Sequence, residues 1–212
     1  MVIRSILFVC LLFVANVSHA QFHHNTDYYF DRSDAMLRQQ LAEVEKHHLG
    51  PCMQGYQEHH YVQAYQDCEF MLNYFPNHPR ALLLMAQICE AWKNPHCNSE
   101  PFFERAIEIN PEVSGTYSVV GIYQLRLKKV PEAIGSLKKA VELDQNSING
   151  HYNLALAYFE SKQYELSNQH AQLAYQLGAP LPGLREKLKK AGQWNPSEPQ
   201  SGGRSQDTRS QK

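Results

Sequence analysis

This sequence lacks the features by which nucleic-acid-binding proteins are usually recognised. No run of lysine and arginine is longer than two residues, and the formal net charge of the 212-residue chain is −1. A protein that neutralises phosphates needs a basic face or stripe, which this balance does not supply. Hydrophobic residues make up 43% and charged residues 19%, as in globular rather than disordered proteins. We therefore expect a folded protein with no nucleic-acid partner.

Motifs that mark catalytic or cofactor sites are also missing. There is no glycine-rich phosphate loop, no HExxH and no GxSxG. CxxC is absent, and so is the CxxCH motif of covalent haem attachment. We expect no catalytic residue and no cofactor. One alternative is an enzyme that uses Cys97 with its neighbour His96, but adjacent residues rarely form such a pair, because the imidazole must approach the sulfur from a separate element.

Long hydrophobic runs are absent except at the amino terminus. Residues 1–20 carry one positive charge, Arg4, then an apolar stretch from Ile6 to Val17 interrupted at Asn16, and end on Ser18-His19-Ala20. This order is typical of a secretory signal peptide, and the run is shorter than the roughly 18–20 apolar residues that a membrane-spanning helix needs. We predict cleavage after Ala20 and a mature protein in the periplasm or a secreted space, with no stable membrane span.

Cysteine is scarce, and export changes how the few cysteines are interpreted. Four of the five follow the predicted cleavage site: Cys52, Cys68, Cys89 and Cys97. An even number of cysteines in an oxidising compartment favours disulfides over a free thiol.

A repeat of 34 residues occupies much of the chain. The segments AIEINP (106–111), AVELDQ (140–145) and AYQLGA (174–179) begin with alanines that lie 34 residues apart, twice. The same spacing aligns Tyr117 with His151 and Gly121 with Ala155. Between these positions each unit has the pattern of one amphipathic helix, a polar turn and a second helix, so the sequence predicts stacked helical hairpins.

The unit resembles the tetratricopeptide repeat (TPR) family, in which small and large residues alternate at fixed positions of two helices. Two units carry the matching positions: Tyr117, Val120, Gly121, Ala133, Leu137 and Ala140 in 114–147, and Leu154, Ala155, Tyr158, Tyr164 and Ala174 in 148–181. Unit 79–113 fits with one extra turn residue, and unit 45–78 is degenerate. The resemblance implies an all-α fold, a right-handed α-solenoid of helix-turn-helix repeats with capping helices at both ends.

The remaining segments are assigned around this array. Residues 1–20 form the signal peptide, and 21–44 contain an N-terminal capping helix with Ser33 as its N-cap and Leu37, Leu41 and Val44 as its apolar stripe; we expect Gly50-Pro51 to end this helix. The repeats span 45–181. Residues 182–194 form a C-terminal capping helix with Leu184, Leu188 and Trp194 as its apolar contacts, and the polar segment 195–212 is expected to be disordered.

The repeat register brings particular cysteines together. Cys52 and Cys68 fall at facing positions on the two helices of the first unit, while Cys89 lies on a first helix and Cys97 in the turn that follows it. This favours the bridges Cys52–Cys68 and Cys89–Cys97. A Cys68–Cys89 bridge across two units is the competing possibility, and it would leave Cys52 and Cys97 unlikely to meet.

The resemblance also implies a concave groove lined by the first helices of successive units, where TPR proteins bind protein partners. The matching positions are Arg80, Leu83, Gln87, Ile122, Leu125, Arg126, Asn149, Tyr152, Asn153, Leu156 and Phe159. A clamp for a terminal carboxylate is incomplete here, because Tyr152 stands where lysine is expected beside Asn153. We expect an adaptor without enzymatic activity that binds an apolar helix or extended segment of a protein, unless the C-terminal helix covers these residues; self-association is also possible.

Histidines supply an alternative function. The chain has eleven, with adjacent pairs at 23–24, 47–48 and 59–60. Adjacent helical residues point about 100° apart and chelate a metal poorly, so we interpret the pairs as surface residues. The candidate that would bind metal is His23, the third residue of the predicted mature chain. Its imidazole, the terminal amine and two backbone nitrogens could hold Cu(II) or Ni(II), which would make the protein an extracytoplasmic metal-binding protein.

Overall fold

The computed structural model describes residues 25–195, and this part of the chain is helical without a β-strand. The helices are α1 (Ala35–Val44), the π-helical turn η1 (Glu45–Leu49), α2 (Gly50–Gln57), α3 (Tyr61–Tyr74), α4 (Pro79–Trp92), α5 (Glu100–Ile109), α6 (Ser114–Arg126), α7 (Val130–Leu143), α8 (Ile148–Glu160), α9 (Tyr164–Gln176) and α10 (Gly183–Lys190). Among these helices none is long and apolar enough to cross a membrane.

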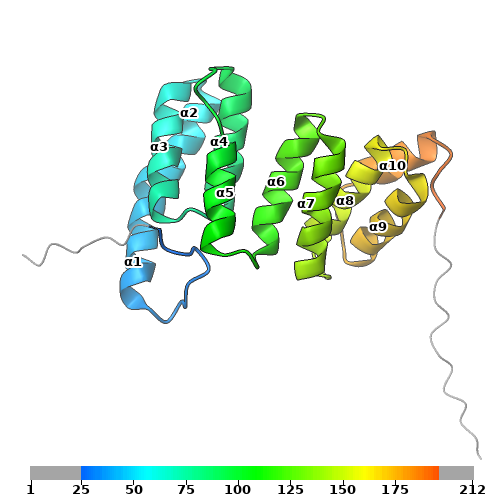
Figure 1. Cartoon of the computed structure of the whole chain (residues 1–212), viewed down its shortest axis with the longest axis horizontal. Helices are drawn as coiled ribbons and strands as arrows, with labels where there is room; N and C mark the ends of the chain where they lie inside the picture. Colours follow the sequence, from blue (N-terminus) through cyan, green and yellow to red (C-terminus); the bar gives the residue numbers. More distant parts are fainter. Residues whose placement is uncertain (1–24, 196–212) are drawn as a thin grey trace, which may run out of the picture.

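Consecutive helices pair as antiparallel hairpins, and the hairpins stack side by side into an elongated array (Figure 1). The closely packed pairs are α2–α3, α6–α7 and α8–α9; residues 93–99 join α4 to α5, and α10 packs on α8 and α9. Short polar turns join the helices, and Pro79, Pro101 and Pro131 occupy the first turns of α4, α5 and α7, where a missing backbone N–H costs nothing. The array is an all-α, TPR-like solenoid, as the repeat pattern predicts.

The expectation that Gly50-Pro51 ends the first helix is wrong. α1, η1 and α2 follow one another without a break, and the backbone stays helical through Gly50. A proline inside a regular α-helix removes one hydrogen bond, and its ring collides with the carbonyl four residues earlier, here that of His47. The wider π-turn immediately before Pro51 relieves that collision, so the helix bulges instead of ending.

The N-cap of α1 is also shifted by one residue from the prediction. Asp34, not Ser33, caps the helix, because its carboxylate accepts a 3.0 Å hydrogen bond from the Leu37 N–H. The Ser33 hydroxyl and N–H both donate to the Asp31 carboxylate, at 2.8 Å each. Asp31 thus stabilises the turn before the helix, and Asp34 caps the helix itself.

The buried side chains form three clusters along the array. The largest extends from α1 to α6 and includes Met71, Phe75 and Met85, while Leu137, Leu154 and Tyr158 anchor a second cluster between α7 and α8. α6 joins the two, because its Val120 packs into the first cluster while its Gly121 faces Leu137 of α7. The helices of the α6–α7 hairpin thus approach closely at a position where no side chain intervenes.

An N-terminal segment with two turns, residues 25–34, crosses the ends of three helices, and we call it the strap. The Asp27 carboxylate accepts hydrogen bonds from the side-chain amides of Asn77 and Asn110, at 2.6 and 2.8 Å. The Tyr28 N–H donates in turn to Asn77 Oδ1 at 2.7 Å. Asn77 is fully buried, and a buried polar side chain needs hydrogen-bond partners. The strap supplies two of these hydrogen bonds, one to the side-chain amide and one to the side-chain oxygen.

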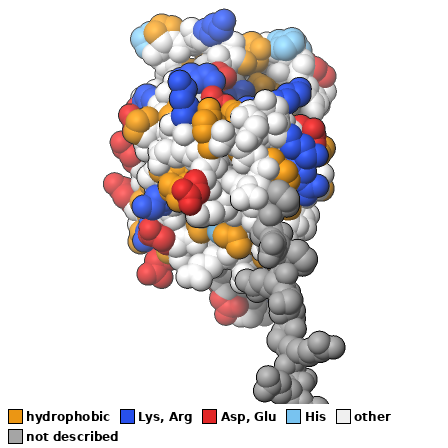
Figure 2. Space-filling model, turned by 90° about the vertical axis from the view of Figure 1, so that its right-hand side faces the viewer, with side chains coloured by type: hydrophobic (Ala, Val, Ile, Leu, Met, Phe, Trp, Pro, Cys, Tyr) orange, Lys and Arg blue, Asp and Glu red, His pale blue; other side chains and the backbone are white. Residues whose placement is uncertain are grey.

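The C-terminal end of the array is closed by α10. Its Leu184 and Leu188 are fully buried against α8 and α9, and Trp194 packs edge-on against Tyr175. Lysine, arginine and hydrophobic side chains are interspersed on this end of the molecule, with no single large apolar patch (Figure 2). The packing satisfies the requirement that a terminal unit of a solenoid present a polar outer face.

Candidate partner-binding surfaces

The groove residues predicted on α4 and α6 lie on neighbouring helices and remain at least partly accessible. Leu83 on α4 and Leu125 on α6 are half-buried at the edges of the first and second clusters. Ile122 is also half-buried. Arg126 is exposed and forms a salt bridge with Glu90 of α4, which ties the two helices together across this face. The structure therefore brings these residues onto one surface that mixes aliphatic and polar groups.

α10 covers some of the groove residues predicted on α8 and leaves others accessible. Tyr152, Leu156 and Phe159 pack against the cluster that contains Leu184 and Leu188. The Leu184 N–H donates to the Tyr152 hydroxyl at 3.3 Å, and the Lys187 ammonium lies 5.5 Å from the centre of the Phe159 ring. The chain's own C-terminal helix thus covers the aromatic part of the predicted surface.

The other α8 and α4 positions stay outside this contact. Asn149 is exposed and Asn153 is half-buried, neither belonging to the cluster under α10. Arg80 is exposed at the start of α4, and Gln87 is half-buried near its middle. The accessible part of the predicted groove is therefore its α4–α6 portion with the asparagines of α8 at its edge.

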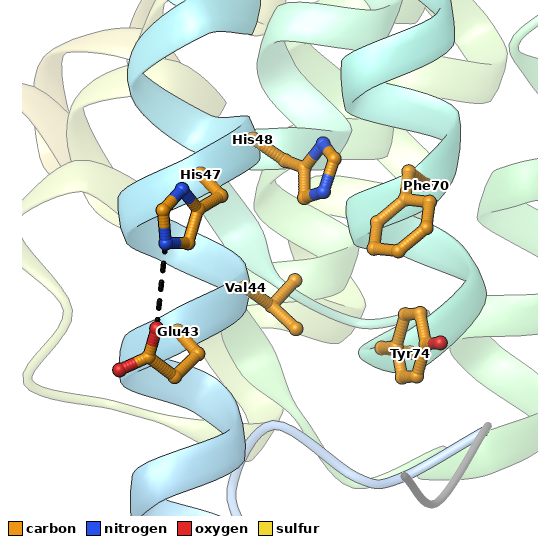
Figure 3. Close-up of a pocket in the computed structure, with 6 residues that line it drawn as sticks. All are labelled: Glu43, Val44, His47, His48, Phe70 and Tyr74. Carbon is orange, nitrogen blue, oxygen red and sulfur yellow. Dashed lines mark ion pairs between the residues drawn. The ribbon is translucent and has the colours of Figure 1, made fainter.

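A second concave feature, which sequence reasoning missed, lies beside the π-turn (Figure 3). Val44, Phe70 and Tyr74 line it together with Glu43, His47 and His48. His48 stacks on Phe70 with 3.9 Å between ring centres, and its Nδ1 lies 3.0 Å from Asp67 Oδ1. His47 points the other way and pairs with Glu43 at 3.4 Å. The mostly apolar lining suits an aliphatic or aromatic side chain.

One signal in the sequence could have located this pocket. A Gly-Pro dipeptide inside an otherwise helical pattern, with an adjacent histidine pair just before it, can mark a bulged helix as well as a helix end. The bulge turns His48 toward α3, where it is largely buried, whereas His47 stays exposed. The interpretation of both histidines as surface residues is therefore wrong for His48.

Two histidines face each other between α8 and α9. His151 Nε2 lies 3.0 Å from the Gln145 carbonyl oxygen, and this contact requires a hydrogen on Nε2. His151 Nδ1, which lies 2.9 Å from His170 Nδ1, must then accept, so His170 donates. Burial, followed by the charge that His151 can carry, lowers the pKa of His170 to about 4. His170 is therefore neutral near pH 7.

The structure contains the two disulfides that the repeat register favours. Cys52–Cys68 joins α2 to α3 in the buried core, and Cys89–Cys97 joins α4 to the turn before α5. All four cysteines after the first twenty residues are thereby paired, and no thiol remains beside His96 for the alternative enzyme. The N–H of His96 donates instead to Asn94 Oδ1 at 2.9 Å.

No group of three or more metal-ligating side chains occurs within residues 25–195. His59 contacts the Tyr61 hydroxyl at 2.7 Å, and His60 pairs with Glu58 at 3.4 Å. His23, the candidate copper or nickel ligand, lies outside the described residues, as do the predicted signal peptide and segment 196–212. The metal-binding alternative therefore stays a prediction.

The repeats are similar in sequence to repeats of known proteins. A family model described as TPR repeat matches residues 125–162. Protein O-mannosyl-transferase TMTC3 from Mus musculus is 30% identical over 88 residues, which is 42% of this chain and 10% of that protein. The Homo sapiens protein is 28% identical over the same length. The chain thus spans about a tenth of the length of these curated relatives.

Solved structures share the fold at low identity. The MamA protein aligns with a TM-score of 0.53 and 13% identity over 71% of this chain and 81% of its own. PilF of Pseudomonas aeruginosa aligns with a TM-score of 0.57 and 16% identity, over 72% of this chain and 71% of its own. PilW, a type IV pilus biogenesis factor, aligns with a TM-score of 0.54 and 20% identity, over 67% of each chain. Residues 125–162 thus match the tetratricopeptide repeat, and the solved structures show that the described helical hairpins have a TPR-like fold.

Proposed function

We propose that the protein is a non-enzymatic adaptor outside the cytoplasm that binds a segment of a partner protein on the face formed by α4, α6 and α8. The observation that carries this proposal is the neighbouring placement of these first helices, with aliphatic side chains that the array buries only in part. Partly buried aliphatic residues on a rigid face are typical of sites that accept an apolar helix or an extended chain.

The composition of this face indicates the kind of segment it would bind. Leu83, Ile122 and Leu125 supply the apolar contacts, and Gln87 and Arg126 provide hydrogen-bond donors beside them. The Arg126–Glu90 salt bridge is solvent-accessible on both sides, so a partner carboxylate could compete for Arg126 at modest cost. An amphipathic segment with aliphatic residues on one side and an acidic residue on the other fits these groups.

Export is part of the proposal, and the disulfides support it. Two disulfides, one fully buried, are typical of a protein that folds in an oxidising compartment. The leader-like residues 1–20 point the same way. Amino-terminal sequencing of the protein from its host tests this part: a start at Gln21, free or cyclised, supports export, and a start at Met1 contradicts it.

In-cell photo-crosslinking tests the adaptor function. A photoreactive amino acid replaces Gln87 on the proposed face, and a matched control replaces Lys138, an exposed residue on the second helix α7. We expect one dominant protein partner from position 87, reduced by Leu83→Asp or Ile122→Asp, and little from position 138. Equal capture from both positions, or crosslinks only to the protein itself, would overturn the proposed face.

A further inference from the structure

The pair formed by α4 and α5 is irregular, because α5 is short and follows a turn closed by a disulfide. α5 has 10 residues, whereas α7 in the following hairpin has 14. Residues 93–99, a turn closed by the Cys89–Cys97 disulfide, take the place of the missing first helical turn. In a regular solenoid the second helix of one hairpin covers the flank of the next hairpin along its full length. Here α5 begins only at Glu100, and its amino-terminal end borders a pocket.

A pocket of about 250 Å³ lies at this point, between α5, α6 and α7. Its apolar lining is Phe103 and Ile107 from α5 and Val120 and Tyr123 from α6. Phe103 and Val120 are buried, and the Phe103 and Tyr123 rings contact each other with 5.1 Å between their centres. The floor is thus held by the core of the array, and the pocket can receive a large aliphatic side chain without rearranging it.

The rim of the pocket is acidic. Glu100, Glu104 and Glu132 line it together with Gln124 and a single cation, Lys129. Lys129 is engaged with Glu100 at 3.0 Å, and this carboxylate raises the pKa of Lys129. Within residues 25–195, Glu104 and Glu132 form no salt bridge. Two carboxylates, Glu104 on α5 and Glu132 on α7, therefore flank the apolar floor without a salt bridge in the described chain.

We propose that this pocket is a second docking site, which binds a protein segment carrying one aliphatic side chain flanked by lysine or arginine. The aliphatic group would enter the floor formed by Phe103, Ile107 and Tyr123. The flanking cations would meet Glu104 and Glu132 at the rim, where complementary charge favours encounter and selects against acidic segments.

This site is separate from the α4–α6–α8 face of the proposed function. On α6, the pocket residues Val120, Tyr123 and Gln124 lie on the side of the helix opposite to Ile122 and Arg126, because successive residues are rotated by about 100°. The two sites can therefore be occupied independently, and loss of one leaves the other in place.

Titration of the oxidised protein with short capped peptides tests the proposal by NMR. The probe is Gly-Lys-Leu-Lys-Gly, and the comparators are Gly-Glu-Leu-Glu-Gly and Gly-Lys-Ser-Lys-Gly. We expect the probe to shift amide signals of α5 and the first turn of α7, saturably, and each comparator to bind at least about tenfold more weakly. Equal binding of the comparators, or shifts confined to α4 and α8, would overturn the pocket as the site.

Charge reversal in the protein provides the second measurement. Glu104→Lys and Glu132→Lys should each weaken the probe severalfold, and salt should weaken binding to the unmodified protein. The matched control is Glu142→Lys, on the last turn of α7 and outside the pocket lining. Unchanged affinity in Glu104→Lys and Glu132→Lys, with the melting temperature preserved, would contradict the proposal.

Discussion

A β-carbon built on Gly121 would lie 2.4 Å from Cγ of Leu137 and 2.8 Å from its Cδ2. Leu137 is fully buried between α7 and α8, so it has little room to move away. The small residue at 121 is therefore required by the packing of one specific side chain on the neighbouring helix. We expect Gly121→Ala to destabilise the protein by about 1–3 kcal/mol through overpacking, and Gly121→Leu by more, as measured by urea denaturation.

Gly135 provides the matched control on α7. A β-carbon there meets nothing within 4 Å, and its backbone is helical. Gly135→Ala should leave stability unchanged or raise it by up to about 1 kcal/mol, because alanine loses less conformational freedom in a helix. Equal effects at 121 and 135 would show that helix propensity, and not the contact with Leu137, decides the outcome.

The two disulfides should contribute unequally. Replacing Cys52 and Cys68 together by alanine opens a loop with a sequence separation of 16 and leaves a gap at two fully buried positions. We expect a loss of about 3 kcal/mol from chain entropy plus a cavity cost. The Cys89 and Cys97 pair, with a separation of 8 and partial exposure, should cost about 2.5 kcal/mol without that addition. A larger loss for the second pair in urea denaturation contradicts this ranking.

Stability should fall on mild acidification because of His170. Its pKa in the folded protein is about 4, below the ordinary value of 6.5, so the unfolded chain binds the proton first as pH falls. Its contribution is therefore fully present above pH 6.5 and is lost progressively between pH 6.5 and 4. Since the side chain is only about half buried, solvent screening reduces the effect to on the order of 1–2 kcal/mol.

Thermal unfolding of the protein and of His170→Gln over this pH range separates this contribution from other titrating groups. The variant should lose less stability between pH 6.5 and 4 than the unmodified protein. His78, whose pKa burial lowers despite its contact with Glu45 at 3.0 Å, continues to destabilise both proteins in the same direction. Parallel pH profiles for the two proteins would show that the His151–His170 contact does not carry the effect.

Asp27 should be the critical residue of the strap. Asp27→Ala removes the acceptor of the Asn77 and Asn110 side-chain amides and leaves a fully buried donor on Asn77 unpaired. We expect a loss of about 1–3 kcal/mol in urea denaturation. Asp31→Ala, which affects only an exposed turn and its contacts with Ser33, should cost less. A smaller loss at Asp27 than at Asp31 would mean that the strap is not coupled to the folded core.

The fold class could be predicted because the repeated small and large residues are themselves the packing contacts. Gly121 and Leu137 appear in the pattern for the same reason that they touch in the structure. The surfaces were harder to predict. Tyr152, Leu156 and Phe159 are apolar residues at positions that line a groove in the repeat pattern. Nothing local in the sequence tells whether a partner protein or α10 covers them. Pro51 is locally compatible with a helix end or with a preceding π-turn, and the sequence around it does not choose; in the structure the π-turn is present and His48 contacts Asp67 of α3.

The position of the disulfides gives the array a direction. Both disulfides lie between residues 52 and 97, whereas α6 to α10 are held by non-covalent contacts. Because each unit of a solenoid is stabilised mainly by its neighbours, separation can start at an end and spread inward. Under tension the C-terminal hairpins can unravel to their full length, while the N-terminal ones can lengthen only as far as their cross-links allow. The two disulfides therefore shorten the maximum extension of the N-terminal hairpins, whereas no disulfide limits the extension of α6 to α10.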